Sequence, residues 1–225
     1  MLNMRLASLV SGGKDSLLAT HLASEENEID CLVSVVSSNP DSYMFHTPNI
    51  HLVDATAIAM DLPLFKIFTR GEEELEVKDL IKGLRNLDVD GIVIGGIASS
   101  YQKKRFELVC EELGLKLIAP LWGKSDEEVM KLAMEKMDFI IVKVSAMGLS
   151  EKWVGRKMDE KALSELKKIK EKYGINLAGE GGEFETLVLN APMFKKRIEI
   201  LESHVVSDNM SAVMVVDRYR LVDKG

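Results

Sequence analysis

The hexapeptide Ser11-Gly12-Gly13-Lys14-Asp15-Ser16 combines residue types that bind phosphate. Glycines allow backbone N–H groups to close around an anion without interference from a Cβ atom. The lysine adds a positive charge, and the two serines add hydroxyl donors. A carboxylate would repel a phosphate directly, so we interpret Asp15 as a ligand of a Mg²⁺ ion that bridges to the phosphates. The segment therefore predicts a phosphate-binding loop with Asp15 as its metal ligand.

This loop differs from two common nucleotide-binding motifs. The pattern GxxxxGK[ST] would require glycine in place of Ser8 and serine or threonine in place of Asp15, and GxGxxG does not fit either. The alternative is a plain glycine turn with a solvated lysine. We favour the phosphate loop because the hexapeptide follows an apolar, strand-like run and precedes a helical pattern.

A second cluster of chemically useful residues lies in the glycine-rich segment Gly179–Thr186. It carries three carboxylates, Glu180, Glu183 and Glu185. Carboxylates can bind a cationic group, attract ammonium, or accept the proton that a nitrogen nucleophile loses. From the residues alone, a solvated acidic loop is an equally good interpretation.

Strand–turn–helix units must position the first cluster. Apolar runs predict buried parallel strands, with helical periodicity between them, at 6–10, 31–36, 64–68, 91–94 and 115–121. Five such units in series indicate an α/β fold with a doubly wound parallel sheet and helices on both faces. The hexapeptide then lies at the carboxyl edge of the sheet, where ligands of α/β proteins bind.

The pattern of elements changes after Gly123. A capping box at Ser125 and Glu128 predicts the start of a helix. Further elements are expected as a strand at 139–144, a helix at 159–173, and three strands without intervening helices at 187–189, 197–202 and 211–216. This predicts a smaller α+β subdomain over residues 124–225, beside a first domain over residues 1–123.

Composition excludes several classes of protein. The 225 residues are 46% hydrophobic, and 29 basic against 36 acidic side chains give a net charge of −7, which argues against stable nucleic-acid binding. No apolar run approaches the ~20 residues of a membrane span, so we expect a cytoplasmic protein without membrane contact. Cys31 and Cys110 lie in apolar patterns, and we expect both to be buried, reduced thiols.

The hexapeptide resembles the PP-loop of the ATP pyrophosphatases, the Rossmann-like family that includes GMP synthetase, NAD synthetase and the tRNA thiolases. The resemblance implies ATP and Mg²⁺ as cofactors, cleavage of ATP between its α and β phosphates, and adenylation of an acceptor. It also places adenosine against the ends of the second and fourth strands. Contacts with ATP are then expected from the hexapeptide and from Ser37, Gly95, Gly96 and Ile97.

Three further segments, 44–49, 95–99 and 179–186, resemble those of the diphthine–ammonia ligase branch of this family. The resemblance covers nearly the whole chain. It implies that the enzyme adenylates the diphthine carboxylate of translation elongation factor two and amidates it with ammonium, which gives diphthamide, AMP and pyrophosphate. Residues 1–123 would bind ATP, and residues 124–225 would bind the acceptor.

The same resemblance assigns roles to residues. Four are expected to be catalytic, namely Lys14, Asp15, Glu183 and Glu185. Contacts with the acceptor are expected from His46, Asn49, Glu180, Gly182, Glu183, Glu185 and Thr186. Ammonium is expected as the nitrogen source, because the resemblance leaves no part of the chain for a glutaminase domain.

Alternative functions remain open at this stage. A sibling branch amidates a small corrinoid acid, and a tRNA-modifying enzyme would use the same loop. A non-catalytic ATP-binding module is an alternative of another class, although it would not need Asp15 or the acidic segment. A homodimer is compatible with the sequence.

Overall fold

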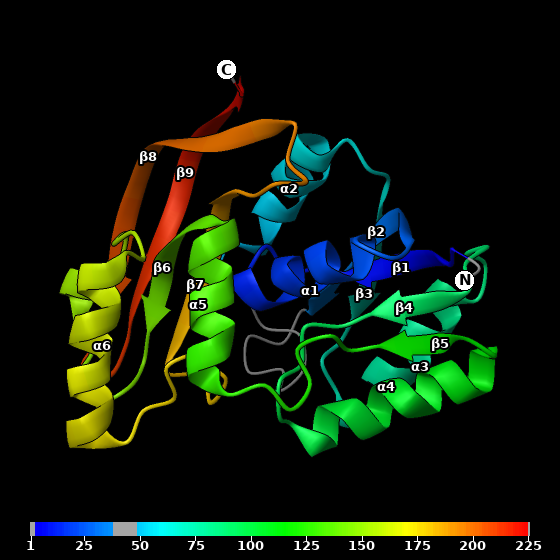
Figure 1. The fold of residues 1–225 in the computed structure, drawn as a ribbon, viewed down its shortest axis with the longest axis horizontal. Coiled ribbons are helices and arrows are strands. Elements are labelled where there is room, and N and C mark those ends of the chain that lie inside the picture. The colour runs from blue at the N-terminus through cyan, green and yellow to red at the C-terminus, as the bar shows by residue number, and fades with distance from the viewer. Residues whose placement is uncertain (1–2, 38–48, 225) are drawn as a thin grey trace.

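The computed structural model describes residues 3–37 and 49–224, which form two β-sheets that lie side by side (Figure 1). The first half of the chain builds a parallel sheet, and the second half builds an antiparallel one. Helix α1 (Lys14–Ser24) lies between them. Among the described residues, no helix has the length and apolar character needed to cross a membrane.

The parallel sheet has five strands in the order β3-β2-β1-β4-β5. Their bounds are β1 (Arg5–Leu9), β2 (Glu28–Ser37), β3 (Leu64–Thr69), β4 (Gly91–Val93) and β5 (Lys116–Ile118). The prediction of five parallel strands is confirmed, although β5 is shorter than the apolar run at 115–121. Chain connections leave β1 and β4 toward opposite faces of the sheet, and such a switch creates a crevice at the carboxyl ends of the strands.

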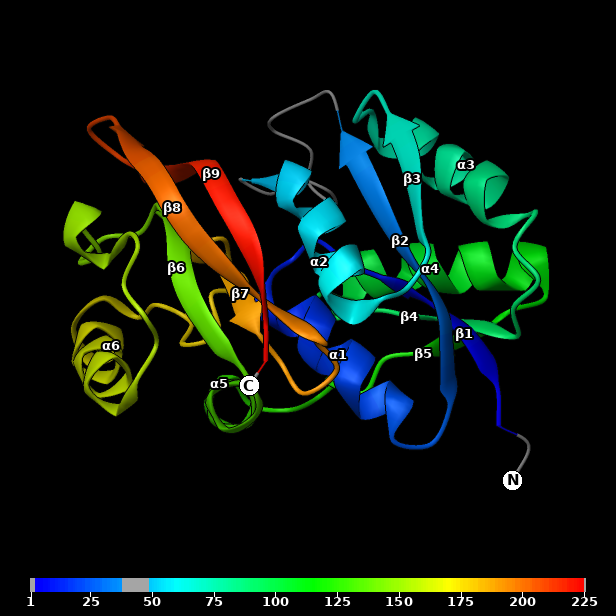
Figure 2. The same ribbon diagram turned by 90° about the horizontal axis from the view of Figure 1, so that it is seen from above.

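Helices cover both faces of this sheet, as expected for a doubly wound fold (Figure 2). Alternate strand residues point to opposite faces. Ala7 and Val33 pack with α3 (Glu73–Leu84) and α4 (Ser100–Leu113), whereas Leu6 and Leu32 pack with α1 and α2 (Val53–Met60). A short 3-10 helix, η1 (Ile50–Leu52), precedes α2.

The antiparallel sheet has the order β7-β6-β9-β8. Its elements are α5 (Asp126–Lys136), β6 (Asp138–Val144), η2 (Glu151–Trp153), α6 (Glu160–Tyr173), β7 (Phe184–Asn190), β8 (Lys196–Ser207) and β9 (Ala212–Asp223). The capping box at Ser125 and Glu128 is confirmed. β8 and β9 are longer than predicted, because polar and charged residues within 203–207 and 217–223 interrupt the apolar pattern at opposite ends of this hairpin.

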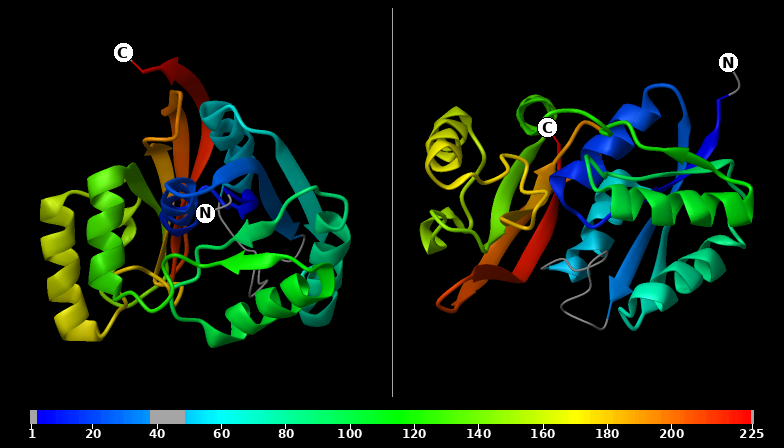
Figure 3. Two further views of the ribbon diagram at one scale, coloured as in Figure 1. Left: turned by 45° about the vertical axis from the view of Figure 1, so that its right-hand side comes forward. Right: turned by 90° about the horizontal axis from the view of Figure 1, so that it is seen from below.

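The two halves lie against each other in Figure 3, and one hydrophobic core contains residues of both. It contains Leu18 of α1 together with Met130 of α5, Phe139 of β6 and Val188 of β7. Cys31 and Cys110 are buried and unpaired, as expected. The predicted boundary between residues 123 and 124 stays a prediction, but each sheet is built from one side of it.

Candidate active site

The predicted phosphate loop is the turn that joins β1 to α1. Gly12 has a φ of 87°, a left-handed conformation that favours glycine. The loop is closed by its own serines, because Gly13 N donates to Ser11 Oγ over 3.4 Å and Ser16 Oγ donates to Gly13 O over 3.1 Å. Since α1 begins at Lys14, the N–H groups of Asp15 and Ser16 lie in the first turn of a helix and have no intrahelical partner.

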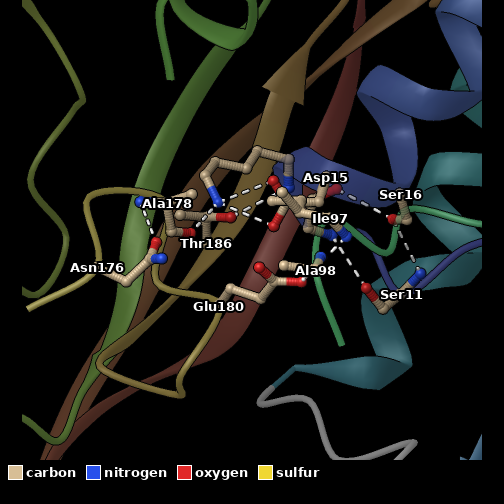
Figure 4. Close-up of polar contacts among 11 residues, drawn as sticks. Ser11, Asp15, Ser16, Ile97, Ala98, Asn176, Ala178, Glu180 and Thr186 are labelled. Atoms are coloured by element: carbon tan, nitrogen blue, oxygen red, sulfur yellow. Dashed lines mark hydrogen bonds and ion pairs between the residues drawn. The ribbon is translucent and has the colours of Figure 1, made fainter. Parts of the chain in front are cut away.

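Two hydrogen bonds donated by backbone N–H groups connect this loop to β7 of the second sheet. Lys14 N donates to Thr186 Oγ1 over 3.1 Å, and Val188 N donates to Gly12 O over 3.0 Å. Figure 4 shows Thr186 beside the loop. Thr186, predicted to contact the acceptor, therefore positions the loop in this structure. The second half of the chain therefore takes part in building the predicted phosphate site.

The Lys14 side chain is 2% exposed and has three acceptors for its three N–H bonds. Its Nζ lies 3.0 and 2.9 Å from the carboxylate oxygens of Asp15, and it also donates to the carbonyl of Ala178. Burial raises the pKa of Asp15 above its ordinary value, although the Lys14 ammonium opposes that shift. Nearby Glu180 adds to the rise in pKa. The structure thus brings Lys14, Asp15 and Glu180 into one electrostatic group.

Glu180 reaches from the loop before β7 to the turn after β4 (Figure 4). Its Oε1 accepts from Ile97 N over 3.0 Å and from Ala98 N over 2.6 Å. Two convergent backbone N–H groups close to the start of α4 are a typical anion-binding arrangement. In this structure, a carboxylate of the chain itself fills that arrangement.

The two glycines after β4 differ in what surrounds them. A Cβ atom at Gly95 would lie 2.7 Å from Asp15 C and Ser16 N, so the turn is pressed against the start of α1. A Cβ atom at Gly96 would meet nothing closer than 3.9 Å. The expected contact of both glycines with ATP stays a prediction. The structure adds that Gly95 is required by the approach of one backbone segment to another.

A second ion pair lies between two strands of the antiparallel sheet. Antiparallel pairing of β6 with β7 places Lys143 opposite Glu185, and Lys143 Nζ donates to Glu185 Oε1 over 2.9 Å. Both side chains are 20% exposed. Sequence reasoning missed Lys143, because it belongs to no motif. The available signal was a single charge inside the otherwise apolar run 139–144.

Glu183, also predicted to be catalytic, turns back into its own loop. Its Oε1 accepts from Asn176 N over 2.9 Å, its Oε2 is buried without a partner among the described residues, and its side chain does not line the cavity. Gly182 does line the cavity, and its carbonyl accepts from Ser145 Oγ. The roles predicted for Glu183 and Gly182 stay predictions.

These groups surround a cavity of about 760 Å³ between the two sheets. That volume lies within the range of small-molecule sites, about 300–1,000 Å³. Val33, Val35 and Phe106 supply an apolar part of the wall, and Ile97 and Gly96 lie at its edge from the turn after β4. Within the described part of the chain, the charged groups of the lining are Lys14, Asp15, Lys143, Glu180 and Glu185.

Two other predicted site residues, Ser37 and Asn49, do not line this cavity. Ser37, at the end of β2, lines a separate cavity of about 470 Å³ with Phe68 and Arg70. Asn49 bonds to β9, because its Nδ2 donates to Met214 O over 2.7 Å and its Oδ1 accepts from Val216 N over 2.9 Å. His46 lies outside the described residues, and its predicted role is not tested.

The donor set fits Mg²⁺ held jointly with a nucleotide. Mg²⁺ commonly takes one or two carboxylates from the protein and completes its shell with phosphate oxygens and water. Asp15 provides such a carboxylate at the mouth of the phosphate loop, with Glu180 beside it. Among the described residues, no group of three or more His, Cys, Asp or Glu side chains forms a metal site from the protein alone.

Comparison with known proteins identifies the family. Residues 4–117 match the diphthamide synthase N-terminal domain, and residues 125–222 match the diphthamide synthase C-terminal domain. The chain belongs to the diphthamide synthase family. The resemblance found in the sequence segments is therefore confirmed.

Relatives of this chain include three vertebrate proteins named diphthine–ammonia ligase. Those of Bos taurus and Homo sapiens are each 36% identical over 253 residues, which cover 98% of this chain and 91% of the relative. That of Danio rerio is 34% identical over 235 residues, which cover 93% of this chain and 92% of the relative.

A comparison with solved structures adds one distant likeness. The similar structure is described as a predicted subunit of tRNA methyltransferase from Methanocaldococcus jannaschii. It has 15% identity to this chain, and the match has a TM-score of 0.46 over 84% of this chain and 98% of the other. At that score, the likeness supports no conclusion.

Proposed function

We propose that this diphthamide synthase family member is an ATP-dependent diphthine–ammonia ligase. It amidates the diphthine carboxylate of translation elongation factor two with ammonium. The observation that carries the proposal is the shared cavity, in which the predicted phosphate loop of the first sheet faces the acidic loop and strand β7 of the second. The diphthine–ammonia ligases named above align over nearly the whole chain, both sheets included.

The first half-reaction is adenylation. Ammonia does not displace oxygen from a free carboxylate, so an acceptor oxygen attacks the α-phosphorus of ATP and pyrophosphate departs. In the proposal, the N–H groups of the Ser11–Ser16 loop hold the phosphates and Asp15 holds Mg²⁺. When bound, Mg²⁺ neutralises phosphate charge and so favours the departure of pyrophosphate.

The second half-reaction is amidation. Ammonium loses one proton to become ammonia, ammonia attacks the carbonyl carbon of the adenylate, AMP departs, and the nitrogen loses a second proton. Glu185 lines the cavity and is the carboxylate that we propose for proton acceptance. Glu180 is bonded to two backbone N–H groups, so we assign it to the shape of the turn after β4.

Sulfur transfer to tRNA is not favoured. Burial raises the pKa of both Cys31 and Cys110 to about 11, and buried thiols of this kind react poorly as nucleophiles. A thiolase of this superfamily would need an accessible cysteine. The cysteines therefore support amidation over thiolation.

The direct test supplies the protein with Mg-ATP, ammonium and elongation factor two that carries diphthine. We expect AMP release together with the mass decrease of about one dalton that replacement of OH by NH₂ causes. AMP release with an unchanged factor would contradict amidation. No AMP above the background of a Lys14→Ala control would contradict adenylation, and a corrinoid acid would then be the next acceptor to try.

A further inference from the structure

The cavity must bind an acceptor that carries a negative charge, yet its own charges disfavour one. Asp15, Glu180 and Glu185 contribute three carboxylates to the lining, against two lysines. Phosphates of ATP add further negative charge. An incoming carboxylate therefore needs a cation that is both inside the cavity and able to donate.

Lys14 does not meet that need. Its side chain is 2% exposed, and its three N–H bonds already have acceptors in Asp15 and Ala178. The two N–H groups of Ile97 and Ala98 also bind an oxyanion, but Glu180 occupies them. Both the Lys14 ammonium and this pair of N–H groups are therefore occupied by groups of the chain itself.

Lys143 is the remaining cation of the lining in the described part of the chain. Its ammonium has three N–H bonds and, among the described residues, one hydrogen-bond partner, Glu185 Oε1. It lies on β6, in the half of the molecule opposite the phosphate loop. A carboxylate bound there would stand between the second sheet and the phosphates.

We propose that Lys143 binds the carboxylate of the acceptor and holds it for attack on ATP. This inference rests on the proposed function and specifies where the acceptor binds. Lys143 binds the acceptor oxygen that does not attack, and it then stabilises the negative charge on that oxygen when ammonia adds. Binding of the acceptor carboxylate also weakens the ion pair between Lys143 and Glu185, because the two carboxylates compete for one ammonium.

Pyrophosphate exchange isolates this step. Without ammonium, labelled pyrophosphate enters ATP only when the acceptor is bound and adenylated, so the exchange rate reports on acceptor binding. We expect Lys143→Met to raise the KM for diphthine-bearing elongation factor two about 10-fold or more, with the KM for ATP unchanged. Lys143→Arg keeps the charge and is expected to recover most of the wild-type KM.

A matched control removes another ion pair of the same strand. Lys157 pairs with Asp138 at the other end of β6, outside the cavity, and Lys157→Met is expected to leave both KM values at wild-type levels. Lys143→Gln removes the charge but keeps hydrogen-bond donors, and it replaces the methionine variant if that variant does not fold. Circular dichroism checks the fold of each protein.

The outcomes separate this inference from the function on which it rests. If Lys143→Met leaves the KM for the acceptor unchanged, the assignment is overturned. A rise in the KM for ATP instead of the KM for the acceptor also overturns it, because Lys143 would then bind phosphate. A wild-type protein without acceptor-dependent exchange overturns the proposed function and the acceptor role of Lys143 together. A 10-fold effect on the acceptor alone, recovered by arginine, supports the assignment.

Discussion

Two lysine–carboxylate pairs line the same cavity, and they differ in burial and in the number of hydrogen bonds that each lysine makes. Lys14 and Asp15 are neighbours on the first turn of α1, the lysine is almost fully buried, and every donor of its ammonium is used. Lys143 and Glu185 meet across two strands, are each 20% exposed, and share a single hydrogen bond. The first pair connects two parts of the cavity wall, whereas the lysine of the second pair has N–H bonds left to donate to a ligand.

This difference follows from where each pair sits in the fold. Lys14 joins the phosphate loop to Ala178, in the loop before β7, so its side chain bridges the two halves. Lys143 projects from a strand whose partner supplies the carboxylate, and Glu185 is the hydrogen-bond partner of its ammonium among the described residues. We infer that the first wall is preorganised for phosphate and that the second wall rearranges when the acceptor binds.

The largest expected effect is on adenylation and concerns the first pair. Asp15→Asn removes the charge that we expect to hold Mg²⁺, so AMP formation should fall by at least about 10²-fold. Binding of ATP should persist, because the backbone of the loop is unchanged. Single-turnover AMP formation and calorimetric titration with ATP measure the two quantities. AMP formation within twofold of wild type would remove Asp15 from the mechanism.

Glu185→Gln is expected to affect the other half-reaction. Without a carboxylate to accept a proton, amide formation should slow by about 10²-fold, whereas acceptor-dependent pyrophosphate exchange continues. The two rates are measured on one preparation, amide formation by the mass of the factor and adenylation by pyrophosphate exchange. If the rates of exchange and amidation fell equally, the two pairs would not have separate roles in adenylation and amidation.

The two lysines should also differ in their contribution to stability. Lys14→Met removes a buried ammonium and leaves the partly exposed Asp15 carboxylate and the Ala178 carbonyl without their partner, which should lower the free energy of unfolding by about 3 kcal/mol. Lys143→Met removes one partly exposed bond and should cost about 1 kcal/mol. Urea unfolding of both variants measures the difference. Equal losses would contradict the view that only the first pair is structural.

Glycines beside the first pair provide a smaller test of preorganisation. Gly95→Ala puts a Cβ atom 2.7 Å from the backbone of Asp15 and Ser16, so the free energy of unfolding should fall by about 1–3 kcal/mol. Gly96→Ala is the matched control for stability, since its Cβ atom meets only ordinary contacts. Urea unfolding of the two variants should give clearly different midpoints, and coincident midpoints would show that the turn after β4 yields easily.

The smallest expected effect is a shift in pH dependence. Burial raises the pKa of Asp15 above the ordinary aspartate value of about 3.9, and only the ionised carboxylate binds Mg²⁺. As the pH falls, kcat/KM for ATP should therefore begin to decline at a pH above about 4. Exchange rates across the acid range measure this decline, with circular dichroism at each pH as the check on folding. A decline confined to the ordinary aspartate range would contradict the burial argument.

The two walls also differ in how well the sequence predicts them. Ser11–Ser16 is local in sequence, because a strand, a glycine turn and a helix start place all of its groups together, and the parallel sheet follows from the apolar periodicity. Lys143 has no local signal, since its position depends on the register of β6 against β7, 42 residues farther along the chain. The inward turn of Glu183 depends likewise on Asn176 and on the packing of its loop.

The bonds from Thr186 and Val188 to the phosphate loop have a consequence for engineering. A chimera that joins the first half of this chain to the second half of a relative would inherit the proposed ATP site from both parents. Exchange would succeed only where the incoming β7 offers a hydroxyl to Lys14 N and a backbone N–H to Gly12 O at the same register. The proposed nucleotide site is therefore not a portable module, and new acceptor specificity is better sought in the cavity-facing residues of β6 than by replacement of the second half.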